Sequence, residues 1–456
     1  MGIIKKIILI SVFLIFVPVY IMAADKIPVK VGLLANKANF LIQHNKINQA
    51  VSLLEKFSKE NKAENTYYID FLLGNCFLML DQNMADKSGT RAKGDQYIIK
   101  AAMSYENTVR KNSDFSPAWA NLAKCRYDLE QMGKAGKAFI KTYETSKEKK
   151  PDPLYYASTC YFLNKNYKKA LNIFNKLIKN HPDKIKLEWK ETFVNIFFSL
   201  NRYKQALPWI KQLAASLKGK KKKKWQEILL YQYMSLNMPG KALEFANFLT
   251  KTDPVEPKWW KALTHIYLNQ DNYDKGLESL IIYSFLKPLS QQETCLMADL
   301  YLSCNVPLKA AEFYQKWLNK EIENSPGKKK KSDHIYGKIK RISNAYMQGF
   351  QNENALKWID KGLKLKNDPI LLKIKADILY EQKQYKLALA VYKKLSKFKK
   401  YKGKALLMMG YSAWNHNKIK IAANCFKRAS KFSNQKKSAL RALQHLKNME
   451  NSCETL

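Results

Sequence analysis

The sequence predicts an all-α protein, built as an array of repeated helix pairs that follows an N-terminal export signal. Three observations lead to this prediction. A small residue recurs about every 34 residues through most of the chain, as repeat proteins require. Gly and Pro are scarce, at 16 and 14 of 456 residues, which favours helices over the many turns of an all-β fold. A basic and then apolar segment occupies residues 1–24 and has no counterpart later in the chain.

Residues 1–24 have the order of a secretory signal. Lys5 and Lys6 precede an apolar run from Ile7 to Ile21, and the small residue Ala24 follows. We predict a cleaved signal peptide; the alternative is an uncleaved N-terminal membrane anchor, because the run is just long enough to span a bilayer. Both place the rest of the chain outside the cytoplasm. The sequence has no Asn-x-Ser/Thr sequon, which favours the bacterial periplasm or outer envelope over a eukaryotic secretory route.

The repeat becomes visible when the small residue near the start of each second helix is aligned. Eight of the ten intervals lie within two residues of 34, and the other two are longer, as insertions would make them. The aligned residues are Ala50, Ala101, Ala135, Ala170, Ala206, Ala242, Gly276, Ala310, Ala355, Ala388 and Ala422.

The residues around this position resemble the tetratricopeptide repeat (TPR). The unit from Pro151 to Asp183 matches its consensus at Ala157, Ser158, Tyr161, Tyr167, Ala170, Phe174, Leu177 and Pro182. The resemblance implies a right-handed superhelical solenoid of about eleven TPR helix pairs over residues 31–432, followed by a C-terminal capping helix and tail over 433–456. Small residues let the two helices of a pair approach closely, and large residues fill the space around that contact.

The two longer intervals predict insertions near residues 81–95 and 322–332. Both stretches are polar and contain Gly, and the second ends in the basic run Lys328 to Lys331. Insertions in solenoids usually project as loops. They either bind partners or are neutral additions at tolerant sites.

Chemistry by the chain itself has little support in the sequence. The seven Cys are odd in number and have no paired spacing, and Cys76, Cys125 and Cys160 share one repeat position, so they are expected to pack in the core. A disulfide between neighbouring repeats is the alternative. No metal-ligand spacing, nucleophile elbow or phosphate-binding loop occurs. We therefore predict no enzyme activity, no cofactor and no metal.

The chain is strongly basic, with a formal net charge of +42. Such a charge attracts polyanions. An exported protein seldom meets nucleic acid, so an anionic glycan, the cell wall or lipid headgroups are the candidates. Only 7 of the 80 basic residues are Arg, and Lys is a hydrated point charge rather than a bidentate reader of phosphate. Solubilising charge, or a coding bias towards Lys, is therefore favoured over specific recognition of a polyanion.

The TPR resemblance also implies a concave groove lined by the first helix of each pair. The implied groove residues are Tyr155, Thr159, Phe162, Glu191, Asn195, Phe198, Glu227, Tyr231, Lys258, Lys261, His265, Asp299, Lys340, Asn344, Asp377, Tyr380, Tyr411 and Trp414. Mixed aromatic and polar groups suit an extended peptide. Some TPR proteins grip a peptide carboxylate with a clamp of Lys, Asn and Arg. Lys340, Asn344 and Lys404 match that pattern, but Ile374 and Met408 do not, which argues against a full clamp.

The sequence thus predicts a non-enzymatic periplasmic or envelope scaffold that binds a partner protein segment in its groove, within a cell-envelope complex. In layout it is similar to bacterial envelope TPR proteins that serve secretion or outer-membrane assembly. The alternative is a basic solenoid that binds an anionic envelope polymer or membrane surface as an export or assembly accessory. Positive charge concentrated in the groove would favour the polymer, and charge spread over the convex faces would favour the scaffold.

Overall fold

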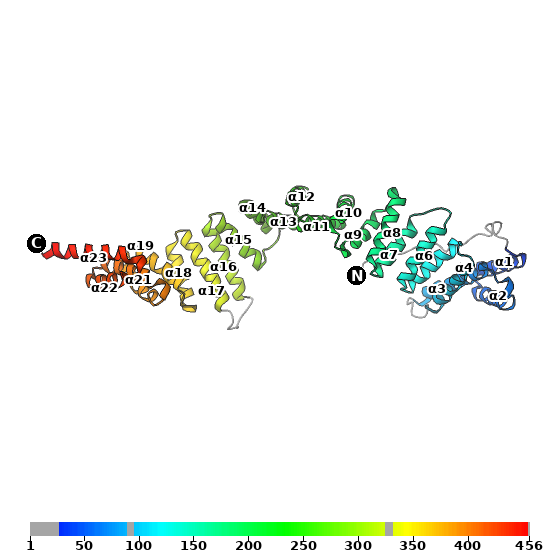
Figure 1. Cartoon of the computed structure of the whole chain (residues 1–456), viewed down its shortest axis with the longest axis horizontal. Helices are drawn as coiled ribbons and strands as arrows, with labels where there is room; N and C mark the ends of the chain where they lie inside the picture. Colours follow the sequence, from blue (N-terminus) through cyan, green and yellow to red (C-terminus); the bar gives the residue numbers. More distant parts are fainter. Residues whose placement is uncertain (1–26, 89–94, 324–331, 455–456) are drawn as a thin grey trace. The chain divides into compact units, whose positions relative to one another are not determined.

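A computed structural model of the chain describes residues 27–88, 95–323 and 332–454. The predicted signal or anchor segment lies outside the described residues. In the part of the chain that is described, all regular structure is helical and comprises 23 α-helices and three short 3-10 helices (Figure 1). None of these helices is both long enough and apolar enough to cross a membrane.

The helices fall into two compact units, residues 1–237 and 238–456. Unit 1 contains α1 (Val29–Gln43), α2 (Ile47–Glu60), α3 (Tyr67–Ser88), α4 (Asp95–Lys111), α5 (Ser116–Asp128), α6 (Met132–Thr145), α7 (Asp152–Leu163), α8 (Tyr167–Asn180), α9 (Leu187–Ser199), α10 (Tyr203–Ser216) and α11 (Gly219–Ser235). Unit 2 contains α12 (Pro239–Thr252), α13 (Pro257–Leu268), α14 (Tyr273–Leu286), α15 (Gln291–Ser303), α16 (Pro307–Glu323), α17 (Ser332–Gln348), α18 (Asn352–Leu365), α19 (Pro369–Glu381), α20 (Tyr385–Leu395), α21 (Lys402–Asn415), α22 (Ile419–Ala429) and α23 (Ser433–Glu454).

The predicted all-α array of helix pairs is confirmed. Within each unit, every helix packs against the next one along the chain. We call the odd-numbered helices α1 to α21 first helices and the even-numbered helices α2 to α22 second helices. All eleven aligned small residues lie on second helices and are buried. After the last pair, α23 packs on α21 and α22, where a capping helix was expected.

Close helix approach at the small residues is visible in the best-matching unit. The Ser158 hydroxyl on α7 donates a hydrogen bond of 2.9 Å to the Ala170 carbonyl on α8. In the last pair, Gly410 lies so near the Phe426 ring that a Cβ on Gly410 would be 2.4 Å from it. The absence of a side chain therefore allows α21 and α22 to come together.

The turns between first and second helices share one backbone conformation. In ten of them, the residue five positions before the aligned small residue has a positive φ of 54–61°. Five of these residues are Asn, which tolerates left-handed geometry better than most residues. Phe350, with φ 57°, is unusual among these ten residues, because bulky aromatic residues rarely adopt left-handed geometry.

The first predicted insertion is partly helical. The helix α3 runs through Asp81 and ends at Ser88, so about half of residues 81–95 extends the first helix. Residues 82–87 contain neither Gly nor Pro, which explains why the helix continues. Of the second insertion, residues 324–331 lie outside the described part.

Three cysteines that share a repeat position are buried free thiols, as their expected packing role requires. Burial raises the pKa of Cys76, Cys125 and Cys160 to about 12. A thiol with so high a pKa is a poor nucleophile at neutral pH. These residues therefore act as small apolar packing groups.

Candidate functional site

The predicted groove residues all lie on first helices, from α7 to α21. Their exposure differs. Tyr155 and Thr159 are buried, and eleven of the eighteen are half-buried. The five exposed residues are Glu227, Tyr231, Lys258, Lys261 and His265.

The two buried residues pack between neighbouring repeats. The ring of Tyr155 on α7 stacks on Trp189 of α9, with ring centroids 4.5 Å apart. The Thr159 hydroxyl donates a hydrogen bond of 2.9 Å to the carbonyl of Tyr155. Their side chains therefore stabilise the repeat stack and offer a ligand little surface.

The adjoining surface of unit 1 is aromatic and acidic. Glu191 on α9 accepts a hydrogen bond of 3.4 Å from the Trp225 indole of α11. Two residues further along α11, Glu227 is exposed, and the Tyr231 ring one turn later is 66% exposed. A residue at i and another at i+4 share one face of a helix. This face of α11 can therefore contact both an apolar and a polar group of a partner.

Lys261 and His265 of α13 adjoin a carboxylate on α15. The Lys261 ammonium lies 2.8 Å from the Glu293 carboxylate, which also accepts a hydrogen bond of 2.9 Å from the Tyr283 hydroxyl. Partial desolvation and the charge of Lys261 lower the pKa of His265, which favours the neutral ring. Although burial alone would raise the pKa of Glu293, hydrogen bonds from Lys261, Ser290 and Tyr283 lower it to about 2.

Replacing Glu293 by Gln is expected to lower the free energy of unfolding by about 1–2 kcal/mol, because charge-assisted hydrogen bonds to the carboxylate are lost. The folded-state pKa lies below the ordinary value of 4.5. The carboxylate therefore stabilises the fold above about pH 4.5, and this contribution is lost as the pH falls towards 2. Denaturant unfolding at several pH values measures both effects.

Glu312→Gln is the matched control for Glu293→Gln, because the Glu312 side chain is 43% exposed and pairs with surface lysines of its own helix. It should change stability little. Equal losses for Glu293→Gln at pH 7 and pH 2.5 would contradict the role given to the ionised carboxylate.

A recurring polar contact joins three helices at two places, and we call it a polar node. A first helix supplies an Asn or Asp acceptor, the following second helix supplies a Tyr, and the next first helix supplies a donor. In unit 1, the Tyr105 hydroxyl donates to the Asn75 amide oxygen at 2.7 Å. The Asn121 amide donates to that oxygen and to the Tyr105 hydroxyl, at 3.2 Å each.

The second polar node is in unit 2 and is ionic. The Tyr314 hydroxyl donates to the Asp299 carboxylate, and the Arg341 guanidinium donates to both of its oxygens, at 2.8 and 3.2 Å. Arg341 also lies over the rings of Tyr314 and Trp317, 5.9 and 5.7 Å from their centroids. The surface around Asp299 is therefore built to hold a guanidinium.

The incomplete carboxylate clamp is further weakened by the structure. The Lys340 ammonium lies 3.5 Å from the Asp368 carboxylate, so it already has an anionic partner. Lys404 is exposed and Asn344 half-buried, while Ile374 and Met408 pack against apolar side chains of the core. These five residues do not form a carboxylate site.

Positive charge is unevenly distributed over the helices. Outside the Lys run at the start of α11, the second helices carry about twice as many Lys and Arg residues as the first helices. The first helices α7 and α15 carry none. The surface predicted to bind a partner is therefore not where the basic charge concentrates.

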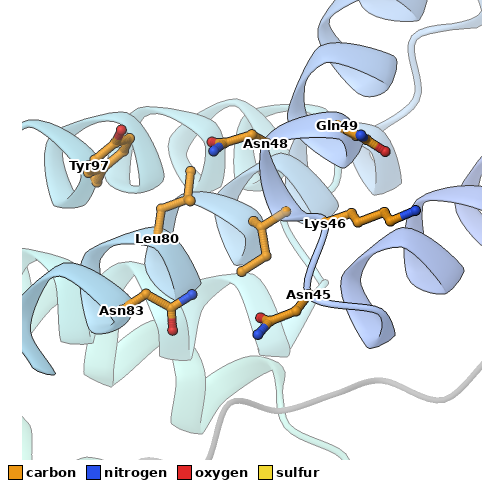
Figure 2. A pocket seen from close by; sticks show the side chains of 8 residues that line it. Asn45, Lys46, Asn48, Gln49, Leu80, Asn83 and Tyr97 are labelled. Atoms are coloured by element: carbon orange, nitrogen blue, oxygen red, sulfur yellow. The ribbon is translucent and has the colours of Figure 1, made fainter. Parts of the chain in front are cut away.

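Two hollows lie away from the predicted groove residues. The first, of about 420 Å³, is lined by eight residues, four of which have amide side chains (Figure 2). Its residues are Asn45, Lys46, Ile47, Asn48, Gln49, Leu80, Asn83 and Tyr97. They come from the α1–α2 turn, the start of α2, α3 and α4, so no single sequence segment signals them.

The second hollow, of about 870 Å³, is apolar and lies in unit 2, between the connection from α15 to α16 and the connection from α17 to α18. It is lined by residues 305–308 and 347–350. Phe350 is 90% exposed there, beside Val306 and Leu308, which are also exposed. Such a patch raises the tendency to associate.

Replacing Phe350 by Asn is expected to raise the free energy of unfolding by about 1 kcal/mol, because Asn tolerates the left-handed backbone better. Little packing is lost, since the Phe350 side chain is almost fully exposed. Thermal unfolding measures the change. The reverse substitution in an equivalent turn, Asn417→Phe, should lower stability, and an unchanged melting temperature in both variants would refute the account.

Comparison with known proteins agrees with this geometry. Residues 154–184, which form α7 and α8, match the family model described as tetratricopeptide repeat. No curated protein matches the sequence.

Among solved structures, the chain is similar to YrrB, described as a TPR protein with an unusual peptide-binding site. The identity is 17% and the TM-score 0.32, over 42% of this chain and 96% of that one. It is also similar to Naa15/Naa10 bound to HypK-THB, at 14% identity and a TM-score of 0.40, over 86% of this chain and 62% of that one. The yeast Tom70 structure matches at 11% identity and a TM-score of 0.28, over 92% and 96% of the two chains. These values are too low to transfer any partner to this chain.

The family assignment depends on the matched helix pair and on its recurrence. The pair α7–α8 fits the family model directly, and its buried small residue and its left-handed turn recur along both units. The chain therefore carries a tetratricopeptide repeat at residues 154–184, within an array of helix pairs that share its buried small residue and its turn geometry.

Proposed function

We propose that this chain is a non-enzymatic scaffold that binds a segment of a partner protein along its first helices. The observation that supports this proposal is a difference in side-chain composition between first and second helices. First helices present half-buried and exposed aromatic, amide and acidic side chains, whereas second helices carry about twice as many basic residues once the Lys run of the first helix α11 is set aside. Aromatic side chains give a peptide rigid apolar contact area, and amides and carboxylates satisfy its backbone and side-chain donors.

The location that fits this role is the bacterial periplasm or outer envelope, within a cell-envelope complex. The proposal is supported by the basic, apolar and small-residue order of residues 1–24. Sequencing the N-terminus of the protein isolated from envelopes tests it. A start near residue 25 supports export with cleavage, an intact start in the membrane fraction supports an anchor, and recovery from the cytoplasm overturns the location.

A second candidate function is binding of an anionic envelope polymer. The observation that favours it is the run Lys220 to Lys224 at the start of α11, most of which is exposed. Lysines at the N-terminal end of a helix are disfavoured by the helix dipole, so the run does not serve helix stability. Binding of this kind would weaken steeply as salt screens the charges.

Affinity capture from solubilised envelopes separates the two candidates. The mature chain is used as bait and washed at low and then at high salt. The scaffold predicts a discrete protein that stays bound at high salt, and polymer binding predicts anionic material that is lost as salt rises.

A matched pair of aromatic substitutions sharpens the capture experiment. Tyr231→Ala changes an exposed ring on the first helix α11, and Phe285→Ala changes an exposed ring on the second helix α14. We expect the former to reduce capture of the protein and the latter to leave it unchanged. Equal effects of the two substitutions would contradict binding along the first helices.

A further inference from the structure

A third copy of the polar node is incomplete. The Tyr392 hydroxyl of α20 donates to the Asp377 carboxylate of α19 at 2.6 Å, as Tyr314 does to Asp299. In the two complete nodes the donor on the next first helix, Asn121 or Arg341, lies 14 residues before the aligned Ala135 or Ala355. The residue 14 before Ala422 is Met408, whose thioether has no donor hydrogen.

Besides Tyr392, Asp377 pairs with Lys373, and its carboxylate can still accept further hydrogen bonds. The Lys373 ammonium lies 2.9 Å from the carboxylate, one turn earlier on the same helix, and both side chains are about one-third exposed. An exposed pair of this kind contributes little to stability. A carboxylate has about four acceptor positions, so Tyr392 and Lys373 together do not saturate Asp377.

Aromatic side chains lie on the first helix that carries this carboxylate and on the next first helix. Tyr380 lies one turn after Asp377 on α19, and Tyr411 lies one turn after Met408 on α21. Tyr380, Tyr411 and Trp414 are half-buried and pack against one hydrophobic cluster, so part of each ring stays accessible. The Tyr411 ring is fixed edge-on against Phe426, with centroids 5.1 Å apart, so it is held ready for a ligand.

The complete node at Asp299 shows what such a surface holds. There, Arg341 combines two hydrogen bonds to the carboxylate with contacts over two aromatic rings. We propose that Asp377 receives a cationic side chain, preferably Arg, from the bound partner segment, in the place that Arg341 occupies at Asp299. This inference rests on the proposed function and adds the chemistry of one recognised residue.

Arginine fits better than lysine for geometric reasons. Its planar guanidinium can donate two parallel hydrogen bonds to a carboxylate and can stack on a ring at the same time. A partner segment that carries an Arg near the ends of α19 and α21 would therefore gain both contacts. Lysines more than about 10 Å away repel it little at 0.1 M salt. The incoming guanidinium competes with the partly exposed Lys373, which lies 2.9 Å from Asp377.

Peptide selection on the purified mature chain tests the inference. Capped random dodecapeptides are selected, and binding of the enriched peptides is measured to the wild type and to three variants. Asp377→Asn removes the charge, Met408→Arg supplies an internal guanidinium as at Asp299, and Met408→Leu keeps the packing without adding a donor. Circular dichroism and thermal unfolding show whether each variant is folded.

We expect enriched peptides to carry one Arg or Lys, and to bind about tenfold more weakly to Asp377→Asn and Met408→Arg but not to Met408→Leu. Replacing that peptide Arg by the neutral isostere citrulline should weaken binding to the wild type but cost nothing more in Asp377→Asn. Because Asn is nearly isosteric with Asp, peptide binding to Asp377→Asn tests the inference even if Met408→Arg does not fold.

The outcomes separate this inference from the proposed function. Peptides that bind Asp377→Asn and wild type equally, or that lack a cationic residue, overturn the inference and leave the scaffold intact. Failure to enrich any peptide overturns both.

Discussion

Replacing Phe174 by Ala is expected to lower the local stability of unit 1 by about 3–5 kcal/mol. Phe174 on α8 is fully buried and lies at the centre of an aromatic cluster. Its ring centroid is 3.6 Å from that of Phe193 and 5.5 Å from that of Trp209. The substitution removes these contacts and leaves a cavity, because the helices on both sides are held by further contacts and cannot close it fully.

The loss should be local, because each repeat contacts only its neighbours. Hydrogen exchange measured by mass spectrometry on the full chain should show reduced protection in α7 to α10 and unchanged protection in α19 to α22. Phe285→Ala is the control, since that ring is 84% exposed. A uniform loss of protection along the chain would show that the array unfolds as a single cooperative unit instead.

The repeat architecture could be predicted from the sequence because it depends on spacing that recurs many times. One small residue per unit must be buried where two helices meet, and Ala50 to Ala422 all satisfy this requirement. A chance match at one unit does not affect a pattern that agrees in ten others. The position of each second helix can therefore be predicted from the spacing of the small residues along the sequence.

The exposure of individual groove residues could not be predicted in the same way. A repeat position identifies a helix face, but the side chain of the next unit decides whether that face is covered. Tyr155 is buried and stacks on Trp189 of the next repeat, whereas Tyr231, also a predicted groove residue, is 66% exposed. Such contacts depend on which residues meet across the interface, and this information is not contained in the spacing.

The polar nodes correspond to a fixed spacing in the sequence, but only the structure shows that the spaced residues are in contact. Tyr314 and Tyr392 each lie four residues after the aligned small residue, and each has an Asp fifteen residues earlier. In unit 1 the insertion separates Asn75 from Tyr105 by 30 residues, which hides the same relation. The amide-lined hollow and the apolar hollow left no such signal, because turns and helices distant in sequence form them.

Replacing Tyr105 by Phe is expected to cost about 1–3 kcal/mol, although only one oxygen atom is removed. The Tyr105 hydroxyl is fully buried, and it donates to Asn75 and accepts from Asn121, which are both buried. The ring cannot shift to compensate, because it lies directly on Gly74, where a Cβ would be 2.6 Å away. Both amides would then lose a partner that water cannot replace.

Tyr314→Phe provides the comparison that separates burial from hydrogen bonding. Its acceptor Asp299 keeps two hydrogen bonds from Arg341 and is 46% exposed, so water can replace the lost hydroxyl. Denaturant unfolding of both variants should therefore show a clearly larger loss for Tyr105→Phe. Equal losses of unfolding free energy would mean that the Tyr hydroxyl contributes the same amount to both nodes. Burial of Asn75 and Asn121 would then not explain the loss in Tyr105→Phe.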